Sequence, residues 1–223
     1  EKFESSLKKE EKSFSYQITL KDLEEIREKV KENSDAFFVF IEYSNKIDQL
    51  LYLYFLMTNE KTTRGTGKLL SSIQILEEAK EHAARFRGLS SGVIARNQNI
   101  LPEEAQVLFS TYSGMTGLLN FNGLLLPPKT KEKLENVKTS HHYHTIIKTF
   151  QTLIEKSKEG NFGLNATDNF STGTQLIARI QEIIDDSSYE LKVFAANMIS
   201  ETKKQFFFNI LLLSSIFVAS LLL

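Results

Sequence analysis

Uncharged residues fill the last 18 positions of this 223-residue chain, from Phe206 to Leu223, and most of them are Phe, Leu, Ile or Val. A helix of that length covers about 27 Å, close to the roughly 30 Å hydrocarbon core of a bilayer. Apolar side chains occupy every face of such a helix, which is typical of a membrane-spanning segment. We therefore expect residues 206–223 to belong to a transmembrane helix; the alternative is a buried C-terminal helix of a soluble protein.

Few helix breakers interrupt the rest of the chain, which has three prolines and ten glycines. With 41% hydrophobic and 25% charged residues, this composition favours long helices in a globular domain over a many-stranded β fold. The chain has no cysteine, which excludes disulfides, thiol nucleophiles and thiolate metal sites. Its formal net charge of −1 gives no basic surface for nucleic acid, so we expect no nucleic-acid partner.

Apolar residues at helical spacing predict five helices packed through apolar seams. The helices are expected near 34–57, near 68–95, from Pro102 to before Pro127, at 129–158, and from near Thr167 onward. In the fourth, Tyr143, Ile147, Phe150 and Ile154 are predicted to face inward. In the last, the predicted seam is Ile177, Ile180, Ile184, Ser187, Leu191, Phe194 and Met198.

The predicted fold class is therefore all-α: one or more antiparallel helical bundles with a long C-terminal helix that continues into a transmembrane helix. We expect three parts: a charged segment or helix at 1–33, a helical domain at 34–200, and a juxtamembrane and transmembrane helix at 201–223. A single helix that belongs to both the domain and the membrane can transmit small axial or rotational shifts. This continuity favours a role in signal transduction.

The helix near 68–95 carries the strongest candidate for a binding residue. If Ala83 is taken as the centre of its apolar face, Arg87 lies about 40° away and Lys80 about 60° away on the same side. A half-buried arginine is costly unless an anion pairs with it. The partner of Arg87 is either a carboxylate from another helix or a bound anion. The guanidinium suits a planar oxyanion such as nitrate, because two parallel N–H groups can meet two oxygens.

A second candidate lies in Arg64-Gly65-Thr66-Gly67-Lys68, which superficially resembles a phosphate-binding loop. Leu69 stands where Ser or Thr is needed to bind magnesium, and no glycine lies five residues before Gly67, so nucleotide binding is not expected. A helix N-terminus near Arg64 can still attract an anion. The candidate ligand-binding residues are therefore Arg87, Lys80 and Arg64.

A histidine cluster, His141, His142 and His144, has no acidic residue at a helpful helical spacing, and adjacent histidines point to different faces. A polar helix surface is favoured over a metal site. The chain shows no Ser-His-Asp order and no paired-carboxylate motif. We therefore expect no enzyme, no cofactor and no metal.

Several stretches resemble the NIT domain, the nitrate- and nitrite-sensing module of bacterial chemoreceptors and related signalling proteins. The resemblance rests on Tyr43–Leu51, on Lys80–Leu89 with Lys80-Glu81 and Arg87-Gly88, on Val93–Ala95, and on Asn169-Phe170, Thr174 and Ile177. It covers about residues 35–198. Phe86 departs from the usual glutamate, Ile94 from phenylalanine and Asn169 from tryptophan. The first helices of the family, with a further arginine motif, are expected to precede Glu1.

The resemblance implies two packed helical bundles with a small anion, nitrate or nitrite, bound between helices. It implies a periplasmic sensor domain in the bacterial inner membrane, a role in chemotaxis, a homodimer, and cytoplasmic signalling partners reached through a downstream output domain. It favours Arg87 as the anion ligand, with Lys80 second. The alternative function is a membrane-anchored helical scaffold without a small-molecule ligand, in which Arg87 pairs with a protein carboxylate.

Overall fold

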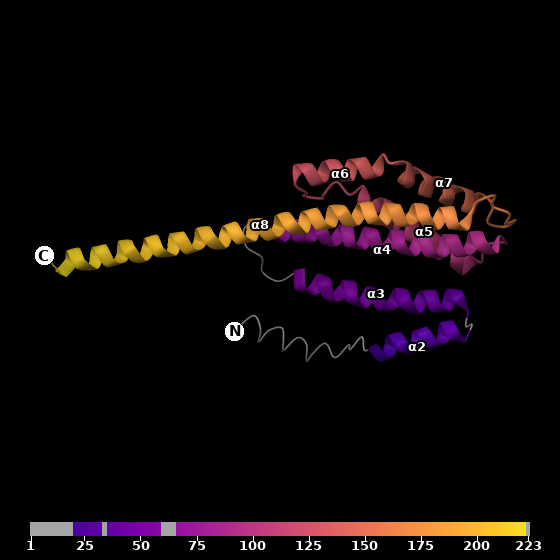
Figure 1. The fold of residues 1–223 in the computed structure, drawn as a ribbon, viewed down its shortest axis with the longest axis horizontal. Helices are drawn as coiled ribbons and strands as arrows, with labels where there is room; N and C mark the ends of the chain where they lie inside the picture. The colour runs from indigo at the N-terminus through magenta and orange to yellow at the C-terminus, as the bar shows by residue number, and fades with distance from the viewer. Residues whose placement is uncertain (1–19, 33–34, 59–65, 222–223) are drawn as a thin grey trace. The chain divides into compact units, whose positions relative to one another are not determined.

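The computed structural model describes residues 20–32, 35–58 and 66–221, and all the regular secondary structure within these ranges is helical. Figure 1 shows the helices in chain order. They are α2 (Leu20–Lys31), α3 (Ala36–Thr58), α4 (Thr66–Arg96), α5 (Pro102–Leu119), α6 (Pro128–Lys138), α7 (His141–Glu155) and α8 (Ala166–Leu221). The all-α prediction is confirmed. The chain divides into two compact units, Glu1–Leu53 and Tyr54–Leu223, which we treat separately.

The first unit contains α2 and most of α3. Asp35 caps α3 by accepting a hydrogen bond from the backbone N–H of Phe38 at 2.9 Å. Lys29 of α2 pairs with Glu42 of α3 at 2.6 Å. Val39 is buried on α3. The sequence pattern does not select this residue, because apolar side chains lie on most faces of the helix and no single buried face stands out.

The second unit is built around α4 and α8, which run antiparallel. Lys80 donates from Nζ to Gln181 Oε1 at 2.7 Å, and Arg87 donates from Nη1 to Thr174 Oγ1 at 3.0 Å. A step of seven residues forward on α4 is therefore matched by seven residues backward on α8. The core of the second unit, to which α5 and α7 also contribute, is mainly apolar; its fully buried side chains include Leu76, Phe86, Leu108, Met115, Ile146, Leu153, Leu176, Ile180 and Ile183.

The single helix predicted at 129–158 is wrong, because two helices, α6 and α7, occupy this range. Thr139 ends α6, and Ser140 begins α7 by accepting a hydrogen bond from the backbone N–H of Tyr143 at 3.3 Å. A serine N-cap satisfies orphan N–H groups of a new helix, so the chain can stop and restart within two residues. The buried face of α7 consists of Tyr143, Ile146, Thr149 and Leu153, whereas the predicted Ile154 is 38% exposed.

The last helix, α8, is 56 residues long, and its buried part ends at Ser187. The long C-terminal helix is confirmed, but its predicted seam remains uncovered beyond that point. Phe194 is 45% exposed, and Leu191 and Met198 are partly exposed. Figure 1 shows this part of α8 extending beyond α4, α5, α6 and α7. An apolar seam needs a facing helix to be buried, and these four helices do not reach that far.

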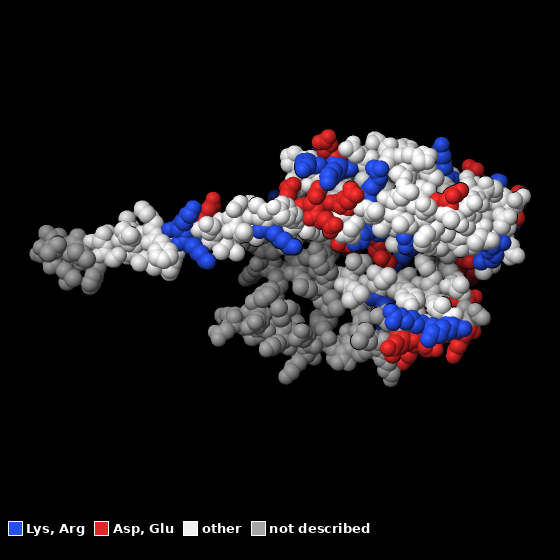
Figure 2. Space-filling model, viewed as in Figure 1, with Lys and Arg blue, Asp and Glu red and all other residues white. Residues whose placement is uncertain are grey.

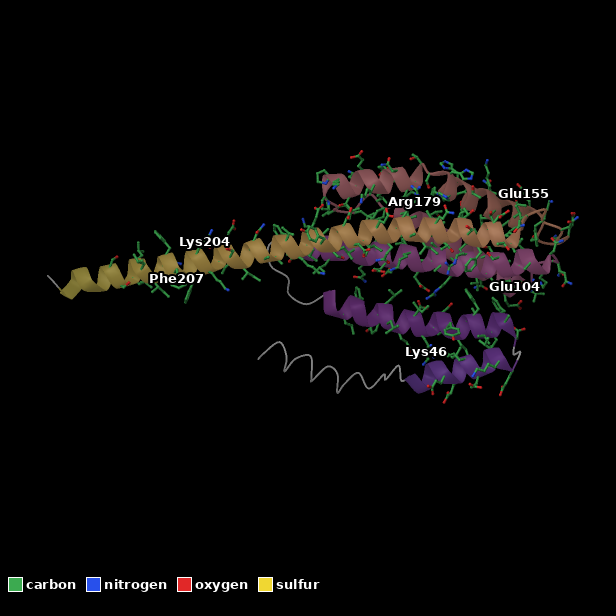
Figure 3. The ribbon with its side chains drawn as sticks, viewed as in Figure 1. Lys46, Glu104, Glu155, Arg179, Lys204 and Phe207 are labelled. Carbon is green, nitrogen blue, oxygen red and sulfur yellow. The ribbon has the colours of Figure 1, made fainter. Side chains whose placement is uncertain are left out.

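Residues 206–215 are helical and exposed, with Phe207 at 73%. Figure 3 shows Lys204 and Phe207 on the extended part of α8, and Figure 2 shows charged side chains there, followed toward the C-terminus by uncharged ones. The side chains of 216–223 lie outside the described residues. Among the residues that were described, no helix is both long enough and apolar enough to cross a membrane.

Candidate anion-binding site

Arg87 lies at the α4–α8 interface, where its side chain runs across Gly173. A Cβ atom added at Gly173 would lie 2.7 Å from Arg87 Cγ and 2.9 Å from Arg87 Cβ, closer than real side-chain atoms approach. The absence of a side chain at Gly173 therefore lets the arginine lie directly on the backbone of α8.

The guanidinium of Arg87 makes two contacts with α8. Its Nη1 donates to Thr174 Oγ1 at 3.0 Å, and its Cζ lies 4.4 Å from the centroid of the Phe170 ring. The Thr174 hydroxyl in turn donates to the backbone oxygen of Phe170 at 2.8 Å, which leaves its lone pairs for the arginine. These contacts orient the guanidinium without neutralising its charge.

The opposite edge of the same guanidinium, formed by Nε and Nη2, is unpaired among the residues that the structure describes. Arg87 Nε is buried and has no hydrogen-bond partner, and Nη2 makes no hydrogen bond to any residue that the structure describes. Within the same residues, no carboxylate lies within ion-pair distance of Arg87. The Nε–H and one Nη2–H of arginine point in parallel, which is the donor pair that a planar oxyanion accepts. The hydrogen-bonding pattern thus leaves this donor pair of Arg87 unused, and one planar anion could accept from it.

The other two predicted site residues are not equivalent. Lys80 lies one heptad before Arg87, but its ammonium contacts the carboxylate of Glu77 and donates to Gln181. Arg64 lies outside the described residues. The structure therefore brings Lys80 to the same helix interface as Arg87, but the Glu77 carboxylate already pairs with its charge.

Asn169 of α8 is a further polar residue beside this interface. It is 5% exposed, and its Nδ2 donates to Ser90 Oγ and Ser91 Oγ, each at 2.9 Å. Its Oδ1 is buried without a partner. The prediction of site residues missed the contribution of α8 altogether, although Asn169, Phe170 and Thr174 belong to the stretch that carries the family resemblance.

A cavity of about 300 Å³ lies within the first unit. Its lining carries both signs of charge; the residues are Glu25, Ile26, Lys29, Glu42, Asn45, Lys46 and Gln49. Lys29 is already paired with Glu42 there. An anion entering this cavity would meet carboxylates as well as ammonium groups, so the cavity is a weaker anion site than Arg87.

The rings of His141 and His142 lie 6.0 Å apart, edge to face, at the start of α7. Among the described residues, no group of three or more His, Cys, Asp or Glu side chains is arranged to hold a metal ion. The polar groups of the candidate site are the Arg87 guanidinium, the Asn169 amide and the hydroxyls of Thr174, Ser90 and Ser91.

The sequence model of one family, described as nitrate and nitrite sensing (NIT), matches residues 3–192 of the 223. The match begins 32 residues before the resemblance at Asp35 and ends at 192 rather than 198. No curated protein and no solved structure matches the chain. The family is one of sensory rather than enzymatic domains. Because the match covers most of the sequence, the chain belongs to the nitrate- and nitrite-sensing family.

Proposed function

We propose that this chain is the extracytoplasmic input domain of a bacterial transmembrane chemoreceptor, and that it binds nitrate or nitrite at Arg87. The observation that carries the proposal is the unpaired Nε/Nη2 edge of a guanidinium that α8 already holds in place. The scaffold alternative requires a protein carboxylate as the partner of Arg87, and the described residues supply none.

The chemistry of the edge supports a small planar anion. Two oxygens of nitrate or nitrite can each accept one of the two parallel N–H groups, and hydrogen bonds to a charged group contribute about 1.5–3 kcal/mol each. The Phe170 ring covers one face of the guanidinium and lowers its exposure to water. A Lys at the same position would offer a point charge without the paired donors.

The site lies where two helices meet, and one of them runs on past the domain. An anion on Arg87 changes the charge at the contact between α4 and the first turns of α8. If two arrangements of α4 against α8 differ in anion affinity, binding shifts their populations. We propose that α8 carries this shift into the membrane through residues 206–223, which have no charged side chain.

The uncovered apolar residues of α8 after Ser187 support the proposal of a homodimer. Leu191, Phe194 and Met198 follow one another at spacings of three and four, which suits a helix pair. A cytoplasmic output domain downstream would connect such a dimer to signalling proteins.

The test is calorimetric titration of the full chain in lipid nanodiscs with the sodium salts of nitrate, nitrite and acetate. We expect nitrate or nitrite to bind the wild type, Arg87→Gln to lose this binding, and Arg87→Lys to weaken it by about tenfold or more. Lys80→Gln is the matched control and is expected to bind nearly as the wild type. Absence of binding to the folded wild type, or undiminished binding by Arg87→Gln, would overturn the proposal.

A further inference from the structure

Asn169 has one satisfied and one unsatisfied end. The residue is 5% exposed; Nδ2 donates to Ser90 and Ser91, while Oδ1 has no partner. Buried polar groups in folded proteins are nearly always paired, so an unpaired amide end next to a candidate binding residue indicates a missing partner.

The unpaired end of the Asn169 amide can be its donor end as well as its acceptor end. The two ends of an asparagine amide are told apart only through their hydrogen-bond partners, and serine hydroxyls both donate and accept. When the amide is turned by a half rotation, Oδ1 accepts from Ser91, and from Ser90 once that hydroxyl gives up its 3.4 Å hydrogen bond to the backbone oxygen of Arg87. The N–H₂ group then occupies the unpaired position, with the loss of that one long hydrogen bond.

The chain places this amide one helical turn from Arg87. On α4, Ser90 and Ser91 follow Arg87 by three and four residues. On α8, Asn169 precedes Gly173, the residue that Arg87 crosses, by four. Because α4 and α8 are antiparallel, both relations put Asn169 on the same side of Arg87, about 5.4 Å along the helices. A nitrate held by a parallel donor pair on one side and by a single donor on the other, with hydrogen bonds of about 2.9 Å, spans about 7–8 Å between the donor atoms. Side chains that extend from two neighbouring helices, one turn apart, can reach across this separation.

We propose that Asn169 is a second ligand-binding residue, whose amide donates to the nitrate oxygen that Arg87 does not hold, and that it thereby favours nitrate over nitrite. This inference rests on the proposed function. When two oxygens of nitrate accept from Nε–H and Nη2–H, the third points away from the guanidinium. Nitrite bound in the same manner has no third oxygen, so the amide gains less from it.

The test compares nitrate and nitrite titrations of the full chain in nanodiscs for the wild type, Asn169→Ala and Asn136→Ala. Asn136 is an exposed helical asparagine on α6 and serves as the matched control. We expect Asn169→Ala to weaken nitrate binding by about tenfold and nitrite binding by less than about threefold, and Asn136→Ala to change neither. An unchanged nitrate affinity, or equal losses for both anions, overturns the inference.

A second measurement does not depend on the alanine variant folding. The side-chain amide signals of isotope-labelled asparagine are recorded by NMR for the wild type, and the signal of Asn169 is assigned by its loss in Asn169→Asp. We expect this signal to shift on addition of nitrate and much less on addition of nitrite. If nitrate does not change the chemical shift of the Asn169 side-chain amide, the proposed contact between Asn169 and nitrate is refuted.

The two proposals fail in distinguishable ways. If the folded wild type binds neither anion, the proposed function is wrong and Asn169 has no ligand to contact. If the wild type binds nitrate and Arg87→Gln abolishes binding while Asn169→Ala has no effect, only the role of Asn169 is wrong.

Discussion

Arg87 of α4 lies over the ring of Phe170 of α8, with its guanidinium carbon 4.4 Å from the ring centroid. The two residues are 83 positions apart in the sequence, yet this contact joins the candidate ligand residue to the first turns of the helix that leaves the domain. Together with the hydrogen bond to Thr174, it makes the orientation of Arg87 depend on the position of α8. Under the proposed function, the same dependence would let an anion at Arg87 bias α8.

Replacing Phe170 with leucine tests the stacking contact. Leucine keeps an apolar cover but has no π face, and a cation–π contact at a partly exposed site contributes about 0.5–1 kcal/mol. We expect Phe170→Leu to weaken nitrate binding by about two- to fivefold in calorimetry. Phe109→Leu on α5 is the control, since that ring is also exposed but contacts Phe150 instead. Equal nitrate affinities for the wild type and both variants would show that the Phe170 ring does not contribute to anion binding.

A methyl group at Gly173 should displace the arginine. The added Cβ would lie 2.7 Å from Arg87 Cγ, near the stiff base of the side chain, so relief requires α4 and α8 to separate. We expect Gly173→Ala to lower the free energy of unfolding by about 1–3 kcal/mol and to weaken anion binding. The measurements are urea unfolding and nitrate titration.

Gly92→Ala is the matched variant on α4, because its added Cβ meets nothing within 4 Å. It should raise the free energy of unfolding by about 0.5–1 kcal/mol, since alanine has the higher helix propensity. If both glycine variants changed the free energy of unfolding by the same amount, the close approach of Arg87 to Gly173 would not contribute to stability.

The ion pair between Arg96 and Glu104 fixes the turn between α4 and α5. Both Glu104 oxygens accept from Arg96 at 2.6 Å, and Oε2 also accepts from the backbone N–H of Leu101 at 2.9 Å. The Glu104 side chain is 4% exposed, so removing its charge leaves a partly buried cation. We expect Glu104→Gln to cost about 3 kcal/mol and lower Tm by about 6–12 °C in thermal unfolding. Glu103→Gln, on the exposed side of the same turn, should shift Tm little.

The bridge between Lys133 of α6 and Asp186 of α8 predicts a pH dependence of stability. The hydrogen bond from Lys133 lowers the pKa of Asp186, and the same bond raises the pKa of Lys133. A lowered carboxyl pKa stabilises the fold above the pKa of the unfolded chain, and this contribution is lost as pH falls through the folded value. A raised lysine pKa stabilises the fold below the unfolded value and is lost as pH rises through the folded one.

We therefore expect the wild type to exceed Asp186→Asn in stability around neutral pH, with the difference shrinking as pH falls below the ordinary carboxyl pKa and as pH rises above the ordinary lysine pKa. The measurement is the urea midpoint against pH for both proteins. Lys131→Met, at an exposed position of α6, is the control for loss of a lysine and should follow the wild type. A difference independent of pH would show that the bridge does not titrate with folding.

An arginine at position 213 tests the proposed membrane segment. Leu213 is 65% exposed on α8, and an arginine near the centre of a spanning helix costs about 2.5–3.5 kcal/mol on insertion. We expect Leu213→Arg to reduce the fraction of protein that stays in the membrane after alkaline extraction. Tyr189→Arg, an exposed helical site before this segment, should leave that fraction unchanged. Wild-type protein that is itself extracted would contradict a membrane span.

The helical class and the long last helix could be predicted because periodicity and helix breakers are local properties of the chain. Arg87 could be selected for the same reason, since its angle to the apolar face follows from sequence spacing. The division of 129–158 could not, because Thr139-Ser140 interrupts the helix without proline or glycine and only the cap geometry reveals it. Of the inward face predicted for α7, Tyr143 is buried, but the helix presents Ile146 and Leu153 to the core rather than Ile147 and Ile154.

By itself, the sequence determined that the chain is helical and that its C-terminal residues are uncharged, and it made Arg87 a candidate anion ligand. Only the tertiary structure decided that Lys80 is neutralised by Glu77, that Arg87 rests on Gly173 and Phe170, and that Asn169 joins Ser90 and Ser91. The reason is that secondary structure depends on neighbours a few residues apart. The charge state and hydrogen bonding of a site depend instead on groups brought together across distances such as the 101 positions between Lys80 and Gln181.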